Sequence, residues 1–347
     1  MVRGIVVISE DFSEPWDEGI KNFTWSLGNA LRQYGVVTLL NVDRSAVAPN
    51  GDTVRLPSSR TYVSRALVRA IGRADPGIIV YVPSPSATVS SFARSWVLRR
   101  IAPRARVGMV ALIPRRHYGL RSRIVGVLAP HRVFVPSYCS LLHLYNLHIP
   151  GSVIPMGINT NTFHPRLRTQ RDALRGRYGI DRDAFVFLHV GHIRPRRNLD
   201  AMASLARQNN VVSLVVSSTS TPEDPTVRTR LVQSGVRVIR EFLPVQEMYA
   251  LSDCYVFPVV DPEGSIEFPL SVLEALASGL PVISRAFGGL RDHLPAGDDL
   301  RYFENDHDLE AHARAVQTAG DISVRDMSRF SWPRVAGRLL DELEGGE

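Results

Sequence analysis

A single carboxylate, Glu274, interrupts an otherwise apolar helical stretch at residues 268–278. The stretch follows a β-branched strand at residues 255–259 and an acidic loop at residues 260–267. The start of a helix attracts anions through its free N–H groups and its dipole. Ligands of open α/β sheets bind in the loops that follow the carboxyl ends of the strands. We therefore expect this segment to bind an anionic ligand, with Glu274 in a role other than surface solubility.

Charge is unevenly distributed along the chain. Residues 76–171 contain thirteen arginines and no Asp or Glu, a formal charge of +13, whereas residues 172–347 carry −7. A large local field of one sign is typical of a protein with an anionic partner, such as lipid phosphate, a membrane surface or nucleic acid. Buried parallel strands also lack acidic residues, so part of the gap has a structural explanation.

Size and composition indicate a globular protein of two domains, because the chain has 347 residues, 44% of them hydrophobic. No apolar run of about 18 residues is present, so we expect no transmembrane helix. The N-terminus has the pattern of a strand rather than of a signal peptide. Cys139 and Cys254 lie in apolar surroundings, so we expect two buried free thiols, which fits a cytoplasmic protein.

Apolar, β-branched runs alternate with amphipathic stretches along the whole chain. In the first half we expect strands at residues 5–8, 36–42, 78–82, 107–113 and 132–136, and helices at 19–33, 62–72, 90–100, 120–129 and 138–147. In the second half we expect strands at 186–190, 212–217, 236–240, 255–259 and 282–284. This alternation predicts βαβ units and parallel sheets. Two such series predict two doubly wound domains, and a (β/α)₈ barrel is the main alternative.

Four blocks, in the right order, resemble the GT-B-fold glycosyltransferases, specifically the retaining family 4. They are the segment Val153-Ile-Pro-Met-Gly-Ile-Asn, the segment Val190-Gly-His-Ile-Arg-Pro-Arg-Arg-Asn-Leu199, the stretch from Leu243 through the helix with Glu274, and Phe330-Ser-Trp-Pro-Arg-Val-Ala336. The resemblance implies an α/β fold with two Rossmann-like domains facing across a cleft. We expect an acceptor domain at 1–152, a donor domain at 153–330, and a C-terminal helix at 331–347 that packs back on the first domain.

The resemblance also implies which residues contact the phosphates of a nucleotide-sugar donor. Arg197 stands at the position of the family's phosphate-binding lysine. His192, which follows Gly191, replaces the family's arginine, and Arg194 or Arg196 could compensate for it. Cationic side chains of this kind stabilise a leaving diphosphate without a metal ion.

The family's pair of acidic residues is only half present. Glu274 matches the second carboxylate, which accepts hydrogen bonds from the ribose hydroxyls. The first carboxylate, which contacts the donor sugar, would fall at Ile266. Three interpretations remain open: Glu267 takes the role after a loop shift, Glu263 swings in, or the contact is absent.

Backbone groups of two loops complete the expected donor site. The backbone around Phe268 and Pro269 could hold the sugar. In the first half, Gly19 lies in the segment Asp17-Glu-Gly-Ile-Lys-Asn22, where the family has a flexible loop that faces the donor phosphates and the acceptor.

The basic span is expected to contact an acceptor or a membrane through Arg99, Arg100, Arg115 and Arg116. Arginines mixed with Trp and Leu suit an anionic lipid surface, and several members of the family are peripheral membrane proteins with lipid-linked acceptors. His117 lies near the position at which the family often has a histidine beside the reacting sugar. An exposed loop residue is the alternative interpretation for His117.

No metal site or cofactor is expected. The segment Asp181-Arg-Asp183 has the D-x-D form that holds a metal in the other glycosyltransferase fold, but its polar context before a strand favours a turn. The ten His and two Cys show no metal-ligand spacing.

The sequence therefore predicts a retaining, metal-independent glycosyltransferase that moves a sugar from a nucleoside-diphosphate-sugar to an acceptor, lipid-linked or phosphate-bearing. We expect it in the cytoplasm, peripheral on the inner face of the cell membrane. The alternatives are a catalytically degenerate GT-B protein that binds nucleotide-sugar or a partner without turnover, a nucleotide-sugar epimerase, and nucleic-acid binding through the arginines. No nucleic-acid recognition module is apparent, so we expect no nucleic-acid partner.

Overall fold

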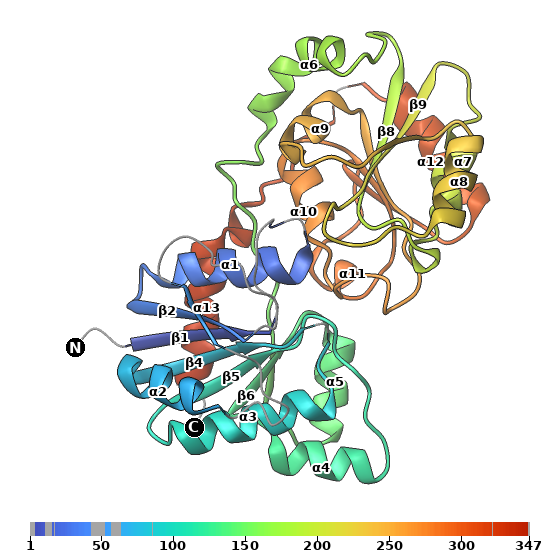
Figure 1. Cartoon of the computed structure of the whole chain (residues 1–347). Coiled ribbons are helices and arrows are strands. Elements are labelled where there is room, and N and C mark those ends of the chain that lie inside the picture. Colours follow the sequence, from blue (N-terminus) through green and yellow to red (C-terminus); the bar gives the residue numbers. More distant parts are fainter. Residues whose placement is uncertain are drawn as a thin grey trace. The chain divides into compact units, whose positions relative to one another are not determined.

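The chain divides into two compact units, each built on a parallel sheet (Figure 1). The structure is a computed structural model that describes residues 4–10, 16, 18–42, 53–56, 64–84, 86–320 and 322–345. Unit 1 comprises residues 1–157, 266–268 and 332–347, and unit 2 comprises residues 158–265 and 269–331. Unit 1 thus continues through Gly157, whereas we expected a boundary at residues 152–153.

The sheet of unit 1 has seven strands in the order β3-β2-β1-β4-β5-β6-β7. The strands are β1 (Gly4–Ser9), β2 (Val36–Asn41), β3 (Thr53–Arg55), β4 (Pro76–Val82), β5 (Arg106–Val110), β6 (Arg132–Val135) and β7 (Gly151–Val153). All neighbours pair in parallel. The central strands β1 and β4 are buried almost throughout, because both faces of a parallel sheet are covered.

Helices cover the two faces of this sheet. One core cluster joins the strands to α2 (Arg65–Ala74), α3 (Val89–Ile101), α4 (Leu120–Leu128) and α5 (Tyr138–Asn146). Alternate strand residues point to the opposite face, where Leu39 lies against α1 (Gly19–Leu31).

The last helix, α13 (Trp332–Glu344), lies on the same face as α1. Its buried residues recur at the spacing of one helix face, and they are Trp332, Val335, Ala336, Leu339, Leu340 and Leu343. The Trp332 ring meets the Phe23 ring of α1 edge to face, at a centroid distance of 5.4 Å. The helix after residue 331 therefore belongs to unit 1.

Unit 2 has a six-stranded sheet in the order β10-β9-β8-β11-β12-β13. Its strands are β8 (Phe185–Val190), β9 (Val211–Val216), β10 (Arg237–Ile239), β11 (Cys254–Phe257), β12 (Val282–Arg285) and β13 (Leu300–Phe303). Its helices are α6 (Arg171–Arg177), α7 (Asp200–Leu205), α8 (Pro225–Gln233), α9 (Val245–Leu251), α10 (Leu270–Ala277), α11 (Leu290–His293) and α12 (Asp306–Thr318), with 3₁₀ turns η1 (Pro165–Gln170), η2 (Pro195–Arg197) and η3 (Ser328–Phe330). A core cluster packs α7, α8 and α12 on one face of the sheet.

The structure differs from the sequence-based expectations at Cys139 and at three strands. Cys254 is buried but Cys139 is exposed, because α5 buries Leu144 and Cys139 lies on another side of the helix. The strands β3, β7 and β13 had no counterpart in the sequence-based prediction, although β10 and β12, which are equally short, did. Among the described residues, no helix is both long and apolar enough to cross a membrane.

Candidate functional site

The topology of unit 2 fixes where a ligand would bind. The strand order reverses between β8 and β11, which are paired neighbours. At such a switch point the loops after the two strands diverge and leave a crevice at the carboxyl edge of the sheet. The loop after β8 carries Gly191 to Asn198, and the loop after β11 leads into α10. The segments that the sequence singled out in unit 2 therefore both follow strands that end at this edge.

The loop after β8 is shaped by a tight turn. Pro195 begins η2, and Asn198 ends it in the left-handed conformation, with φ 52°, which Asn tolerates better than most residues. The Asn198 side chain donates a hydrogen bond to the Pro258 carbonyl, 3.2 Å away, beyond the end of β11. This bond ties the two switch-point loops together.

The turn brings the Arg197 guanidinium back over Gly191. A Cβ atom on Gly191 would lie 3.0 Å from Arg197 Nη1 and 3.0 Å from His189 Nε2. Real Cβ atoms rarely come that close to a neighbour, so a glycine at this position permits the close approach of both groups. Glycine is the residue that allows a backbone to approach another group this closely.

Arg197 is desolvated without an acidic partner. Within the described part of the chain, no carboxylate forms an ion pair with its guanidinium. Burial lowers the pKa of Arg197 to about 10, with the Tyr255 hydroxyl opposing and Arg194 adding to this shift. The side chain is still cationic at neutral pH. Arg197 is half-buried, and a desolvated cation without a counter-charge is costly unless an anion binds to it.

Arg196, the adjacent residue, has the opposite surroundings. Its exposed guanidinium is paired with Glu263 and lies 3.5 Å from an Asp261 oxygen. Gly264 permits this acidic loop to pack closely, since a Cβ there would lie 2.7 Å from the Arg196 carbonyl oxygen. Arg196 therefore holds the acidic loop, and Glu263 is engaged with it rather than directed to a sugar.

His189, which sequence reasoning missed, is a buried polar group directed to the same place. It is fully buried in β8, and its Nδ1 atom lies 2.9 Å from the Val256 carbonyl oxygen of β11. Burial, the Arg197 charge and His192 lower its pKa to about 3, so the ring is neutral. Nδ1 then donates to the carbonyl. Nε2 has no hydrogen-bond partner among the described residues and is left as an acceptor.

Glu274 and two tyrosines form the α10 side of the site. The Tyr249 hydroxyl donates to Glu274 Oε2 at 2.9 Å, and the rings of Tyr249 and Tyr255 are 5.8 Å apart. The Tyr255 hydroxyl donates to the Val190 carbonyl oxygen at 3.4 Å. Burial raises the pKa of Tyr255, the Arg197 charge lowers it and the Glu274 charge raises it. Burial raises the pKa of Glu274 to about 7, although the Tyr249 bond opposes the shift.

Three of the residues expected near the donor sugar, Ile266, Glu267 and Phe268, belong to unit 1. Ile266 is buried, and its Cδ1 atom lies 3.0 Å from the position of a Cβ on Gly19, the first residue of α1. Gly19 thus gives room to Ile266, and Asp17 of the same loop lies outside the described residues.

Glu267 accepts hydrogen bonds from two serines in unit 1. The Ser137 hydroxyl lies 2.8 Å and the Ser140 hydroxyl 2.7 Å from Glu267 Oε1, and the Glu267 N–H donates to the Leu112 carbonyl. Phe268 beside it is fully buried, and Pro269 is the N-cap residue of α10.

The loop after β5 gathers basic side chains at the carboxyl edge of the unit 1 sheet. Arg116 is exposed and donates to Cys139 Sγ, and Arg115 donates to Ser86. His117 is buried, not an exposed loop residue, and its N–H donates to His143 Nε2 at 3.0 Å. Burial lowers the pKa of His117, and the electrostatic effect of His143 lowers it further.

Glu10 was also missed by sequence reasoning, although it directly follows the buried strand β1 at the switch point of unit 1. It accepts hydrogen bonds from the Tyr81 hydroxyl, from the Ser84 N–H at 2.9 Å and from Arg94 at 2.6 Å. These partners give it a structural role. The Asp181 side chain accepts from the Asp183 N–H, which is the turn predicted for that pair. Among the described residues, no group of three His, Cys, Asp or Glu could hold a metal ion.

Comparison with known sequences finds a similarity in the part of the chain that carries this site. Residues 184–320 match the family model of glycosyl transferases group 1. The chain is 30% identical over 213 residues to a D-inositol 3-phosphate glycosyltransferase of Frankia alni, an alignment that covers 54% of this chain and 51% of that one. It is 30% identical over 267 residues to the D-inositol 3-phosphate glycosyltransferase of Xylanimonas cellulosilytica, an alignment that covers 68% of this chain and 63% of that one. The chain spans about half the length of the first of these relatives.

Solved structures extend the similarity to the whole chain. Sucrose-phosphate synthase of Thermosynechococcus elongatus matches with a TM-score of 0.76 at 16% identity, over 99% of this chain and 100% of that one. Anabaena HepE, solved with UDP and glucose, matches with a TM-score of 0.73 at 15% identity, over 98% and 99%. The chain has the GT-B fold. The segment that matches the glycosyl transferases group 1 model lies in unit 2, apart from residues 266–268.

Proposed function

We propose that this GT-B protein is a retaining, metal-independent glycosyltransferase of family 4 that uses a nucleoside-diphosphate-sugar. The observation that carries the proposal is Arg197, a desolvated cation without a carboxylate partner at the switch point of unit 2. A diphosphate is the anion that such a position would accept.

The donor would lie along the carboxyl edge of the unit 2 sheet. Arg197 would bind the diphosphate above Gly191, with His192 beside it. Glu274 would accept hydrogen bonds from the two ribose hydroxyls, in place of the single bond from Tyr249. His189 Nε2 would lie near the Arg197 guanidinium as a neutral acceptor directed to the same point.

The reaction would need no side-chain base. As the bond between the anomeric carbon and the diphosphate oxygen breaks, Arg197 would stabilise the charge that develops on that oxygen. The acceptor hydroxyl would attack from the same side and pass its proton to the departing phosphate. The cationic residue thereby supplies the charge stabilisation for which other transferases use a metal ion.

The acceptor would bind to unit 1 and would carry a phosphate. Arg115, Arg116 and His117 lie together at the carboxyl edge of its sheet, in a span without acidic residues. The curated relatives are named for an inositol phosphate acceptor, and another similar structure is a trehalose-phosphate synthase with bound glucose-6-phosphate. A phosphorylated polyol and a lipid-linked phosphate present the same group to these side chains.

A membrane partner is part of the proposal. The formal charge of +13 over residues 76–171 would hold unit 1 at an anionic membrane surface as a peripheral protein, on the cytoplasmic side.

Transfer is tested with UDP-glucose and a panel of phosphorylated polyols and prenyl phosphates, in the presence of EDTA. We expect a glycosylated product by mass spectrometry, with the anomeric configuration of the donor by NMR. An inverted product would contradict retention, and complete loss of transfer in EDTA would contradict metal independence.

A second candidate is a GT-B protein that binds nucleotide-sugar without turnover. It is favoured by Ile266 at the position of the sugar-binding acid and by the engagement of Glu267 with Ser137 and Ser140. Donor binding without hydrolysis or transfer to any acceptor would support this alternative. Restoring the acid with Ile266→Glu would then be expected to generate activity.

A further inference from the structure

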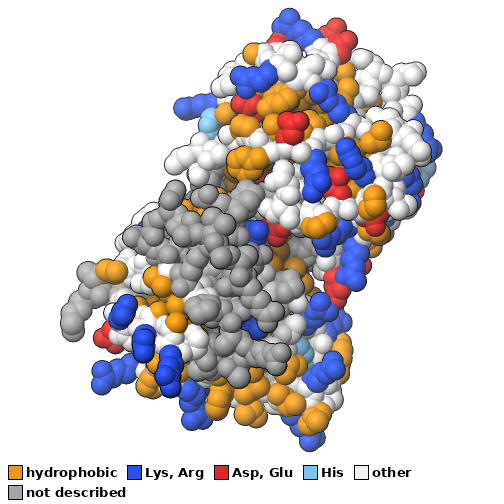
Figure 2. Space-filling view, in the orientation of Figure 1, with side chains coloured by type: hydrophobic (Ala, Val, Ile, Leu, Met, Phe, Trp, Pro, Cys, Tyr) orange, Lys and Arg blue, Asp and Glu red, His pale blue; other side chains and the backbone are white. Residues whose placement is uncertain are grey.

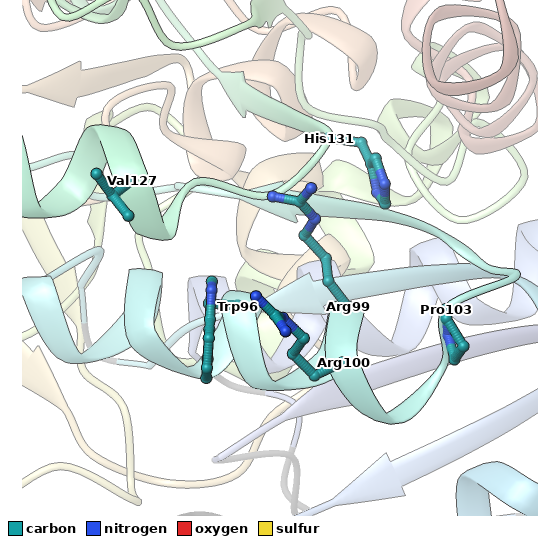
Figure 3. A pocket seen from close by; sticks show the side chains of 6 residues that line it. All are labelled: Trp96, Arg99, Arg100, Pro103, Val127 and His131. Atoms are coloured by element: carbon teal, nitrogen blue, oxygen red, sulfur yellow. The ribbon is translucent and has the colours of Figure 1, made fainter.

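A pocket of about 350 Å³ lies between α3 and α4 in unit 1 (Figure 3). Its walls come from the carboxyl ends of these helices and the start of β6, at the amino edge of the sheet, opposite the edge with Arg115 and His117. The lining residues are Trp96, Arg99, Arg100, Pro103, Val127 and His131. The volume is within the range of small-ligand sites.

The pocket has cationic groups and no acidic counterpart. Arg100 stacks on the Trp96 ring, 4.7 Å from its centroid, and Arg99 donates to the Ala129 carbonyl at 2.8 Å. Within the described part of the chain, neither guanidinium has an acidic partner. His131 Nδ1 accepts from the Val107 N–H at 2.9 Å, so the neutral ring carries its proton on Nε2. Three donor groups can therefore face an anion.

Exposed apolar side chains lie on α4, one of the two helices that line the pocket. On α4, Leu120, Ile124 and Val127 recur at the spacing of one helix face, and Leu120 and Val127 are 73% and 75% exposed. Leu142 and Tyr145 on α5 are exposed as well. In the lower part of unit 1 in Figure 2, hydrophobic and basic side chains lie interspersed. An outward apolar face is unusual for a helix of a water-soluble protein.

We propose that the α3–α4 pocket binds the phosphate of an anionic phospholipid and that the exposed face of α4 enters the bilayer interface. Arginines attract the headgroups, while Trp and aliphatic side chains insert beside them. A soluble phosphate ester would use the same donors but would leave the apolar face of α4 in water, so the lipid accounts for both observations. The inference deepens the membrane association proposed above and rests on it.

The test is co-sedimentation with phosphatidylcholine vesicles, with and without phosphatidylglycerol. We expect binding only to the anionic vesicles. Arg100→Gln should weaken it about fivefold, the contribution of one basic residue near an anionic surface, and Val127→Glu should weaken it further. The matched controls are Arg338→Gln on α13 and Val232→Glu on α8, which change exposed residues of the same types and should bind as the unchanged protein does.

UDP-glucose affinity is measured on the same samples, and it should be equal in all of them. Equal vesicle binding by Arg100→Gln and Arg338→Gln would contradict the proposal that the pocket binds phospholipid. Equal binding of the unchanged protein to neutral and anionic vesicles would contradict it as well. If UDP-glucose still binds when either of these results is obtained, only the lipid site is contradicted, and the glycosyltransferase proposal is not. If the unchanged protein binds anionic vesicles but not UDP-glucose, the result contradicts the glycosyltransferase proposal and still supports the lipid site.

Discussion

Arg196 and Arg197 are neighbours of one residue type with opposite environments. Arg196 is exposed and paired with the acidic loop, whereas Arg197 is desolvated and has no carboxylate partner in the described structure. The difference arises from the 3₁₀ turn at Pro195 and the left-handed Asn198. The sequence could show that cations gather after β8, but the direction of each side chain depends on that turn.

Gly191 is predicted to be essential for the position of Arg197. In Gly191→Ala the added methyl would lie 3.0 Å from both Arg197 and His189 and would displace the guanidinium. We expect UDP-glucose affinity to fall about tenfold, because overpacking costs about 1–3 kcal/mol. Gly176→Ala, where no atom lies within 4 Å of the added methyl, serves as a control. Equal affinities of the two variants, measured by calorimetry, would contradict this placement.

Glu274 should make donor binding depend on pH. A carboxylate that accepts two ribose hydroxyls must be ionised, but burial raises the pKa of Glu274 to about 7. Donor affinity should therefore rise with pH, by up to about tenfold per pH unit below pH 7, and level off above it. UDP-glucose is the suitable probe, since its diphosphate has no proton to lose in this range. Glu274→Gln should bind weakly with a flat pH profile, and an unchanged profile in that variant would refute the ribose role.

The raised pKa of Glu274 should also make the stability of the fold depend on pH, but stability should fall with rising pH where donor affinity rises. Between the ordinary carboxyl pKa of 4.5 and about 7, the unfolded chain ionises Glu274 while the folded protein retains the proton. The unfolded state then binds fewer protons, so stability falls as pH rises through this window. Glu274→Gln should remove that part of the pH dependence in denaturant titrations.

At the scale of elements, the central strands were predictable, whereas β3, β7 and β13 were missed. Strands buried on both faces, such as β1, β4 and β8, are continuous apolar runs, and this makes them visible in sequence. The strands β3, with the sequence TVR, and β7, with the sequence GSV, contain no apolar run of this kind. Residues of the site were visible where they break a pattern, as Glu274 does. His189 lies within an apolar strand, and only the hydrogen bond to β11 reveals its direction.

Arg175 on α6 should be a stability determinant. It is 1% exposed, pairs with Asp253 at 2.5 Å and donates to the carbonyl oxygens of Leu251, Arg182 and Ala184. Arg175→Leu would leave Asp253 and these carbonyls partly unsatisfied, so we expect a loss of about 3–5 kcal/mol in the free energy of unfolding. Arg177→Leu on the same helix breaks an exposed pair with Glu247 and should cost under about 1 kcal/mol. Similar losses in the two variants, by urea denaturation, would contradict the role of Arg175.

At the scale of the whole molecule, the candidate binding residues are distributed over both units. Unit 2 contains Arg197 and Glu274, and unit 1 contains the basic loop and the α3–α4 pocket. The fold class and the division into two parallel sheets were predictable from the alternation of elements. The grouping of Ile266 and Glu267 with unit 1 was not, because Glu267 bonds to serines that are 127 and 130 residues away in sequence.

The most direct test of the central claim is a calorimetric titration of the protein with UDP, GDP and ADP and with their sugars. We predict binding of one nucleotide series, and a loss of about 10- to 100-fold in affinity in Arg197→Ala, because a hydrogen bond to a charged group contributes about 1.5–3 kcal/mol. Arg196→Ala should retain most of the affinity. Absence of binding to every nucleotide, or an unchanged affinity in Arg197→Ala, would contradict the account.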